Sequence, residues 1–169
     1  MAVTRYFGAR IKRREDPRLI TGRGRYTHNV VLPGMVYVSF VRSPHAHAVI
    51  RKIDTSKTEK SSGVLRVLTG GELVDEVVAL PCAWQIPNAD LKVPRYMPLA
   101  VDKVRFVGDP VAAVVASSFE EAADAAQMVE VEYQKLPAVT NPEEAVKPGA
   151  PQLYDEVPDN KALEGGRQR

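Results

Sequence analysis

The apolar residues of this 169-residue chain come in short runs separated by proline, glycine and polar turns, and this spacing limits the possible folds. The longest uninterrupted run, residues 111–116 (VAAVVA), is far short of the ~20 residues that a membrane-spanning helix needs. Short runs rich in β-branched residues are typical of strands. We therefore expect strands with a few helices, and we do not expect a membrane span.

Several segments have the β-branched and aromatic content that favours strands, and each is bounded by turn residues. They are residues 35–41, 46–54, 64–68, 99–101, 104–107, 111–116 and 129–133. Because these segments are short and interleaved with turns and helices, they predict a small mixed sheet rather than a large one.

One longer helix is predicted at residues 119–129. Ser118 and Glu121 have the spacing of a capping box, in which a hydroxyl and a carboxylate bind free backbone N–H groups. The apolar residues that follow recur on one helical face; they are Ala122, Ala123, Ala126 and Val129. Shorter helices are predicted near residues 72–77 and after Asn141. A doubly wound sheet needs more long helices, so the sequence favours an α+β fold with one main helix and short helices.

Charge is distributed unevenly along the chain. Residues 1–25 contain eight basic side chains and two acidic ones, whereas residues 119–164 are mainly acidic. The pattern predicts a basic, extended N-terminal arm at 1–30, a folded domain at 31–147 and an extended acidic tail at 148–169. Such asymmetry is typical of a polyanion contact, of a protein contact or of solvated faces, and the sequence leaves all three open.

The arm and a proline-rich segment are the expected contact surfaces. Residues 81–98 contain four prolines, which exclude a long regular element there. Arginine, tryptophan and tyrosine are the residue types that most often anchor interfaces. The expected contact residues are Arg13, Arg14, Arg18, Arg23, Arg25, Trp84 and Tyr96.

The candidates for chemistry are few. His45 and His47 would share a face on a strand, but a closed metal site needs a third or fourth ligand, so we interpret the pair as structural. Cys82 has no neighbouring base that would activate a nucleophile. Residues 21–26 (TGRGRY) lack the spacing of a phosphate-binding loop and are interpreted as a flexible turn. We therefore expect no catalytic, cofactor-binding or metal-binding residues in this chain.

Partner class and compartment follow from composition and charge. Acidic residues interrupt the basic arm, and the rest of the chain is acidic, so we do not expect nucleic acid as a partner. A single cysteine excludes an intrachain disulfide, and the N-terminus has no apolar signal region. The expected compartment is the reducing cytoplasm.

Three segments, taken in order, resemble one family. Residues 14–26 (REDPRLITGRGRY) are similar to the opening of the large subunit of molybdenum hydroxylases, in the aldehyde oxidase and xanthine dehydrogenase family. Residues 41–48 (VRSPHAHA) and 106–116 (FVGDPVAAVVA) resemble its RSPxAHA and FVGxPVAAVVA segments. The resemblance extends over nearly the whole chain, and the nearest branch is that of the carbon monoxide dehydrogenase large subunit.

The resemblance implies that residues 31–147 form the α/β-hammerhead domain that begins these subunits. In the family, hydroxylation takes place at a molybdenum–molybdopterin cofactor, and electrons leave through iron–sulfur clusters and FAD on partner chains. The molybdopterin-binding motifs and the catalytic glutamate lie after this domain. Since the chain ends at Arg169, the resemblance implies that it binds none of these cofactors alone. The partners it implies are the molybdopterin-binding remainder of the large subunit, the iron–sulfur subunit and the flavin subunit.

Two hypotheses follow. In the first, the chain is a structural, non-catalytic domain of a molybdopterin-dependent oxidoreductase that packs against the cofactor-binding region and partner subunits. In the alternative, it is a freestanding module that binds an acidic protein or a nucleic acid through its arm. The substrate of any complex stays open under both hypotheses.

Overall fold

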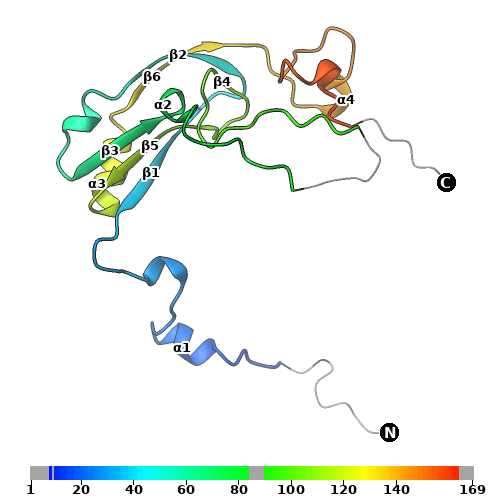
Figure 1. Ribbon diagram of the computed structural model, residues 1–169. Helices are drawn as coiled ribbons and strands as arrows, with labels where there is room; N and C mark the ends of the chain where they lie inside the picture. Colours follow the sequence, from blue (N-terminus) through cyan, green and yellow to red (C-terminus); the bar gives the residue numbers. More distant parts are fainter. Residues whose placement is uncertain (1–7, 9, 84–89, 164–169) are drawn as a thin grey trace, which may run out of the picture. The chain divides into compact units, whose positions relative to one another are not determined.

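The computed structural model describes residues 8, 10–83 and 90–163, and the chain divides after Met35 into two compact units (Figure 1). The first unit contains a short helix, α1 (Asp16–Ile20), and a 3-10 turn, η1 (Thr27–Asn29). The arm is therefore not extended throughout. Pro17 stands in the first turn of α1, where the N–H that proline lacks has no helical partner to lose.

The first of two sheets in the second unit is built around a central apolar strand. β5 (Pro110–Ala116) lies between β1 (Tyr37–Arg42) and β3 (Val64–Thr69), and both pairs are antiparallel. β5 has no charged side chain and is mostly buried, as expected of a strand covered on both faces. It is the strand that the apolar run at 111–116 predicted.

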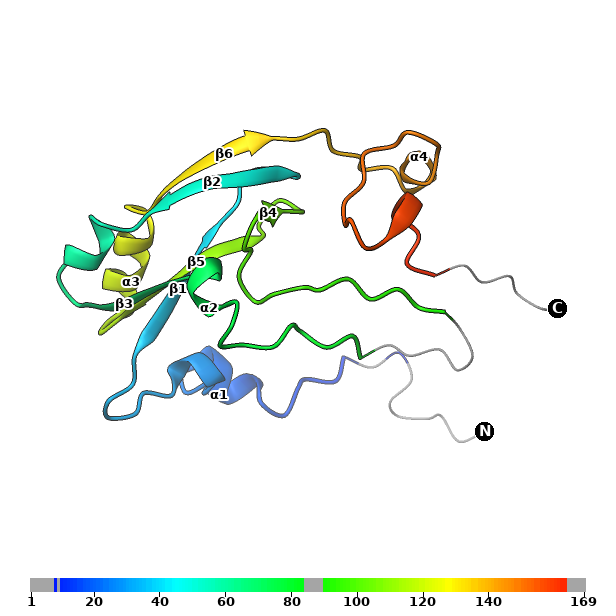
Figure 2. The same ribbon diagram turned by 45° about the horizontal axis from the view of Figure 1, so that its top comes forward.

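The second sheet has three strands with β2 (Ala48–Asp54) in the middle. β4 (Lys103–Val104) and β6 (Glu130–Lys135) pair with it on either side, again antiparallel. Figures 1 and 2 both show β2 beside β6 along one side of the unit. The expected α+β class is confirmed, but the strands form two small sheets instead of one.

The main helix, α3 (Phe119–Ala126), packs against β1 and β5. Its start is fixed as predicted, because the Ser118 hydroxyl accepts from the N–H of Glu121 at 3.2 Å. The Glu121 carboxylate in turn accepts from the hydroxyls of Ser117 and Ser118. These bonds hold the pKa of Glu121 below its ordinary value, the Ser117 hydroxyl first.

The core consists of two clusters of small side chains. In the first, Ala125 and Val129 of the helix region pack on β3 and β5; its buried members are Val67, Ala112, Val114, Ala125 and Val129. The second lies between β2, β4 and β5, with buried members Ala48, Ala100, Val104 and Val111. Partly buried Val41 and Val131 contact both clusters, so the two sheets share one apolar interior.

Helix α2 (Gly70–Leu73) follows β3 directly, and its first residue packs against the neighbouring loop at residues 99–100. Its cap is reciprocal, because the Glu72 carboxylate accepts from both the N–H and the hydroxyl of Thr69. Gly70 is buried against the carbonyl oxygen of Ala100. A β-carbon at residue 70 would lie 2.2 Å from that oxygen, so only glycine fits this approach.

The remaining short elements lie in the loops and the tail. They are the 3-10 turns η2 (Thr58–Lys60) and η3 (Pro158–Asn160) and the helix α4 (Pro142–Ala145). Asn141 caps α4 as predicted, its side-chain oxygen accepting from the N–H of Glu143 at 2.8 Å. The Asn160 side chain binds backbone groups of residues 145, 151 and 153, which folds the tail on itself.

Some boundaries differ from the sequence predictions. Residues 99–101 form no strand, because Ala100 makes one isolated hydrogen bond to Pro110 rather than a ladder. The main helix ends at Ala126 rather than residue 129, in a tighter turn in which Met128 N–H donates to Ala125 O. Ala125, rather than Ala123, completes its buried face. The division into arm, domain and tail stays a prediction.

Within the described residues, no helix has the length and hydrophobicity needed to cross a bilayer.

The two adjacent glycines of α2 give a matched test of this packing. We expect Gly70→Ala to lower the free energy of unfolding by about 1–3 kcal/mol, because the added methyl group meets a backbone oxygen that cannot move independently. Gly71→Ala meets nothing within 4 Å and should leave that free energy unchanged or raise it by up to about 1 kcal/mol. Urea unfolding measures both, and equal effects of the two substitutions would contradict the packing.

Candidate functional site

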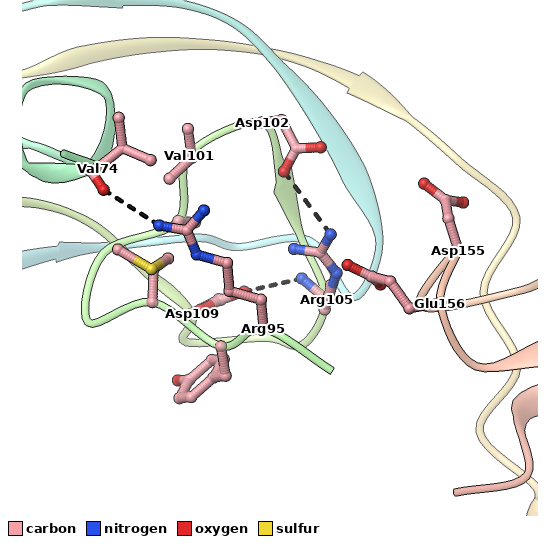
Figure 3. Close-up of a pocket in the computed structure, with 11 residues that line it drawn as sticks. Val74, Arg95, Val101, Asp102, Arg105, Asp109, Asp155 and Glu156 are labelled. Carbon is pink, nitrogen blue, oxygen red and sulfur yellow. Dashed lines mark hydrogen bonds and ion pairs between the residues drawn. The ribbon is translucent and has the colours of Figure 1, made fainter. Parts of the chain in front are cut away.

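A cavity of about 220 Å³ lies between the β4–β5 turn and the acidic tail (Figure 3). Two arginines, Arg95 and Arg105, line it together with four acidic side chains. The acidic lining residues are Asp102, Asp109, Asp155 and Glu156. Ionisable groups of both signs thus converge in one cavity, an arrangement that makes it a candidate functional site.

Arg105 is the centre of this cluster, but its own chain uses its donors. Its Nη1 donates to the carbonyl of Lys103 at 3.2 Å, and its Nε donates to the carbonyl of Leu153 at 3.3 Å. Its guanidinium lies 4.6 Å from the ring centroid of Tyr154 and 3.7 Å from Asp102 Oδ1. These contacts fasten the tail to the β4–β5 turn, an attachment to which the 3.0 Å ion pair of Lys103 with Asp155 also contributes.

Asp109 is the buried carboxylate of the turn, with 2% of its surface exposed. Its Oδ2 accepts from the backbone N–H of Arg105 at 2.9 Å, and its backbone N–H donates to Phe106 O. Burial raises the pKa of Asp109 above its ordinary value, although the hydrogen bond and the charge of Arg105 act in the other direction. These two bonds are local and shape the turn that begins β5, whereas the Asp109 carbonyl oxygen accepts from the N–H of Ser43 at 2.9 Å.

The two histidines of the predicted pair make different contacts. The strand β2 begins at Ala48, so His45 and His47 precede it and do not share a strand face. His47 is buried, and its Nδ1 lies 2.9 Å from the carbonyl oxygen of Pro137. Since a carbonyl only accepts, this nitrogen carries the hydrogen. The ring of His45 instead packs edge-on against Tyr133.

Metal and nucleophile candidates are not assembled in the described part of the chain. Among residues 8, 10–83 and 90–163, no three His, Cys, Asp or Glu side chains are placed to hold a metal ion. Cys82 is exposed. The glycine- and arginine-rich segment at 21–26 follows α1 directly. In this segment Gly22 has a φ of +70°, and its N–H donates to Leu19 O.

The expected contact residues are distributed over both units. The five arginines of the arm are exposed; they are Arg13, Arg14, Arg18, Arg23 and Arg25. Tyr96 is half-buried, and its ring centroid lies 6.3 Å from that of Phe106. Trp84 lies outside the described residues. The role of all seven in partner contact stays a prediction.

A surface that the sequence did not single out surrounds Tyr96. Phe40 and Val38, both half exposed on β1, continue it through Arg42, whose guanidinium lies 5.4 Å from the Phe40 ring. Arg42 also donates to Gly108 O at 2.9 Å, on the turn that carries Phe106. We call Val38, Phe40, Arg42, Tyr96 and Phe106 the aromatic–arginine patch.

The patch has the residue composition of a protein interface. Aromatic residues and arginine are enriched where proteins bind one another. The patch is therefore a candidate contact surface.

Comparison with known families agrees with this geometry. The family described as "Aldehyde oxidase and xanthine dehydrogenase, a/b hammerhead domain" matches residues 21–137, which is more than half of the chain. The chain belongs to this family. The resemblance expected from the sequence is confirmed, and the two small sheets with few helices are its hammerhead fold.

Members of the aldehyde oxidase and xanthine dehydrogenase family resemble the chain over most of its length. The carbon monoxide dehydrogenase large chain of Afipia carboxidovorans is 41% identical over 163 residues, covering 90% of this chain and 18% of that protein. The nicotine 6-hydroxylase large subunit of Paenarthrobacter nicotinovorans is 38% identical over 159 residues, covering 94% and 19%. A crystal structure of Cu,Mo-CO dehydrogenase, 39% identical, has a TM-score of 0.73 and covers 96% and 20%. The chain therefore spans about one fifth of these relatives.

The buried Asp109 gives a pH test of this hammerhead domain. A carboxyl whose pKa is raised on folding contributes stability below its ordinary value of 3.8, and that contribution is lost as pH rises through the folded pKa. We therefore expect the free energy of unfolding of Asp109→Asn, minus that of the wild type, to increase with pH above about 4. Urea unfolding over a pH series measures this difference.

Asp54→Asn is the matched control, with the opposite sign. The Ser56 hydroxyl, followed by the Ser56 N–H and Lys52, holds the pKa of Asp54 at about 2. Its stabilising contribution is complete above the ordinary value of 3.8 and is lost as pH falls toward about 2. A pH-independent difference for Asp109→Asn would contradict the assignment of a raised pKa to Asp109.

Proposed function

We propose that this chain is the structural, non-catalytic hammerhead domain of the large subunit of a molybdenum hydroxylase-type oxidoreductase. The observation that carries the proposal is the alignment itself. About nine tenths of the chain matches proteins named as a large chain and a large subunit, and it spans under one fifth of each. In this proposal the domain packs against the molybdopterin-binding region of the subunit.

The cofactor is held elsewhere in the assembly under this proposal. The cavity around Arg105 does not fit a phosphate-bearing pterin, because its four acidic side chains outnumber its two arginines, and both Arg95 and Arg105 already donate to backbone carbonyls. Like charges in a hollow of this size repel an anionic ligand. In this proposal the molybdenum–molybdopterin group belongs to the remainder of the subunit, and the iron–sulfur clusters and FAD belong to partner subunits.

The chain's own contribution in this proposal is contact surface. The exposed arginines of the arm present positive charge, which suits an acidic partner surface. Tyr96 lies in the aromatic–arginine patch and supplies an amphipathic anchor. Together with Trp84, these residues are proposed to contact the partner subunits. The proposed compartment is the cytoplasm.

Native mass with metal analysis tests the proposal. The untagged chain is isolated from its own source, and its assembly mass, molybdenum and iron are measured. A large assembly that contains molybdenum and iron is the expected result. A metal-free particle of 18.6 kDa would overturn the proposal in favour of a freestanding binding module.

Removal of the basic arm gives a further prediction. Deleting residues 1–25 should lower the fraction of chain recovered in the assembly about tenfold, the factor that a loss of about 1.4 kcal/mol of binding free energy produces. Replacing the five arm arginines by alanine separates charge from length and should give most of the loss. The matched control is the double substitution Glu143→Ala and Glu144→Ala on α4, which should assemble normally. Unchanged assembly of the deletion variant would show that the arm does not contribute to assembly.

A further inference from the structure

Strand β1 lies at an edge of its sheet. In the described part of the chain, β5 is its only strand partner. In an antiparallel pair, alternate residues direct their N–H and C=O groups away from the partner strand. Roughly half of the backbone groups of β1 therefore face outward, which is the arrangement that another extended chain can pair with.

The other edge strands of the described sheets carry protection that β1 lacks. β6 has charged residues at three of its six positions, Glu130, Glu132 and Lys135. β3 has a bulge between Val64 and Arg66, and β4 is two residues long. β1, by contrast, has no charged residue or proline before Arg42, where its own irregularity lies. Charges, bulges and short length are the usual defences against strand addition.

Besides its unpaired backbone edge, β1 has large apolar side chains that are exposed to solvent. Val38 pairs with Val115 and Phe40 with Ala113, so these residues share one face of the sheet. Val38 is 48% exposed and Phe40 is 46% exposed. The half-exposed Phe106 extends the same apolar surface across the aromatic–arginine patch. An added strand would thus gain apolar contacts as well as backbone hydrogen bonds.

Charge indicates what the added strand should contain. The three strands of this sheet carry two charged residues, Arg42 and Arg66, and no acidic residue. Arg66 shares a hollow with Glu59 and Glu72, whereas Arg42 stacks on Phe40. A carboxylate on the added strand, opposite Arg42, would give this arginine an acidic partner that its own sheet does not contain.

We propose that β1 accepts an added strand from the molybdopterin-binding region of the large subunit. The strand places apolar side chains against Val38 and Phe40 and a carboxylate against Arg42. This inference rests on the proposed function. The large subunit is the favoured source of the strand because the relatives are about five times as long as this chain and contain the same domain.

Two substitutions and one control test the proposal in the full chain, expressed from its own locus in its source organism. Phe40→Lys and Arg42→Glu should each lower recovery of the molybdenum-containing assembly at least tenfold. Phe119→Lys, at the 63%-exposed first residue of α3, introduces the same change on another surface and should leave recovery unchanged. Thermal unfolding of each purified chain checks that it is folded.

Amide hydrogen exchange keeps the test decisive if a variant fails to fold. In the wild-type assembly, amides of residues 37–42 should exchange at least tenfold more slowly than in the isolated chain, while those of the β6 edge should not change. Equal exchange of residues 37–42 in the two states would overturn the proposal.

The outcomes separate the two levels of inference. A wild-type chain without a molybdenum assembly overturns the proposed function and this inference with it. A wild-type assembly that persists in Phe40→Lys and Arg42→Glu overturns only the role of β1. Equal loss in Phe119→Lys also overturns the assignment to β1. A metal-free dimer that Phe40→Lys dissociates would overturn it as well, by identifying a second copy as the occupant.

Discussion

The second unit depends on the pairing of β5 with two strands at once. β5 contributes Ala112 and Val114 to one buried cluster and Val111 to the other, so a single strand joins both halves of the interior. Its small side chains permit the close approach of α3, whose Ala122 and Ala125 are buried. A larger residue at Ala112 or Ala125, which share one cluster, would separate the helix from the sheet. The positions of β1, β3 and the aromatic–arginine patch all follow from this strand.

The β4–β5 turn extends the same constraint to the acidic tail. Asp109 fixes the turn from inside, and Arg105 reaches from it to Leu153 and Tyr154. The ion pairs and hydrogen bonds here therefore determine where the tail lies.

Local signals were enough to predict much of this fold. The start of α3 and the cap of α4 were predictable because Ser118 and Asn141 bind N–H groups two or three residues away. The division into two sheets was not, because it depends on pairings such as Ile53 with Val131, which are far apart in sequence. The patch was missed for the same reason: Arg42 and Gly108 meet across 66 residues. The family, in contrast, could be identified from ordered motifs without any knowledge of pairing.

The size of the buried side chains has a consequence for the life of the protein in a cell. Among the described residues, the largest fully buried side chains are three valines and a threonine; they are Val104, Val111, Val114 and Thr58. A core of such small groups yields little transfer free energy per residue, so in the proposed assembly a covering neighbour would contribute a large share of the net stability. Chains made in excess of that neighbour would open often enough for proteases to remove them. The abundance of this polypeptide would then be set by the supply of its neighbour rather than by its own rate of synthesis.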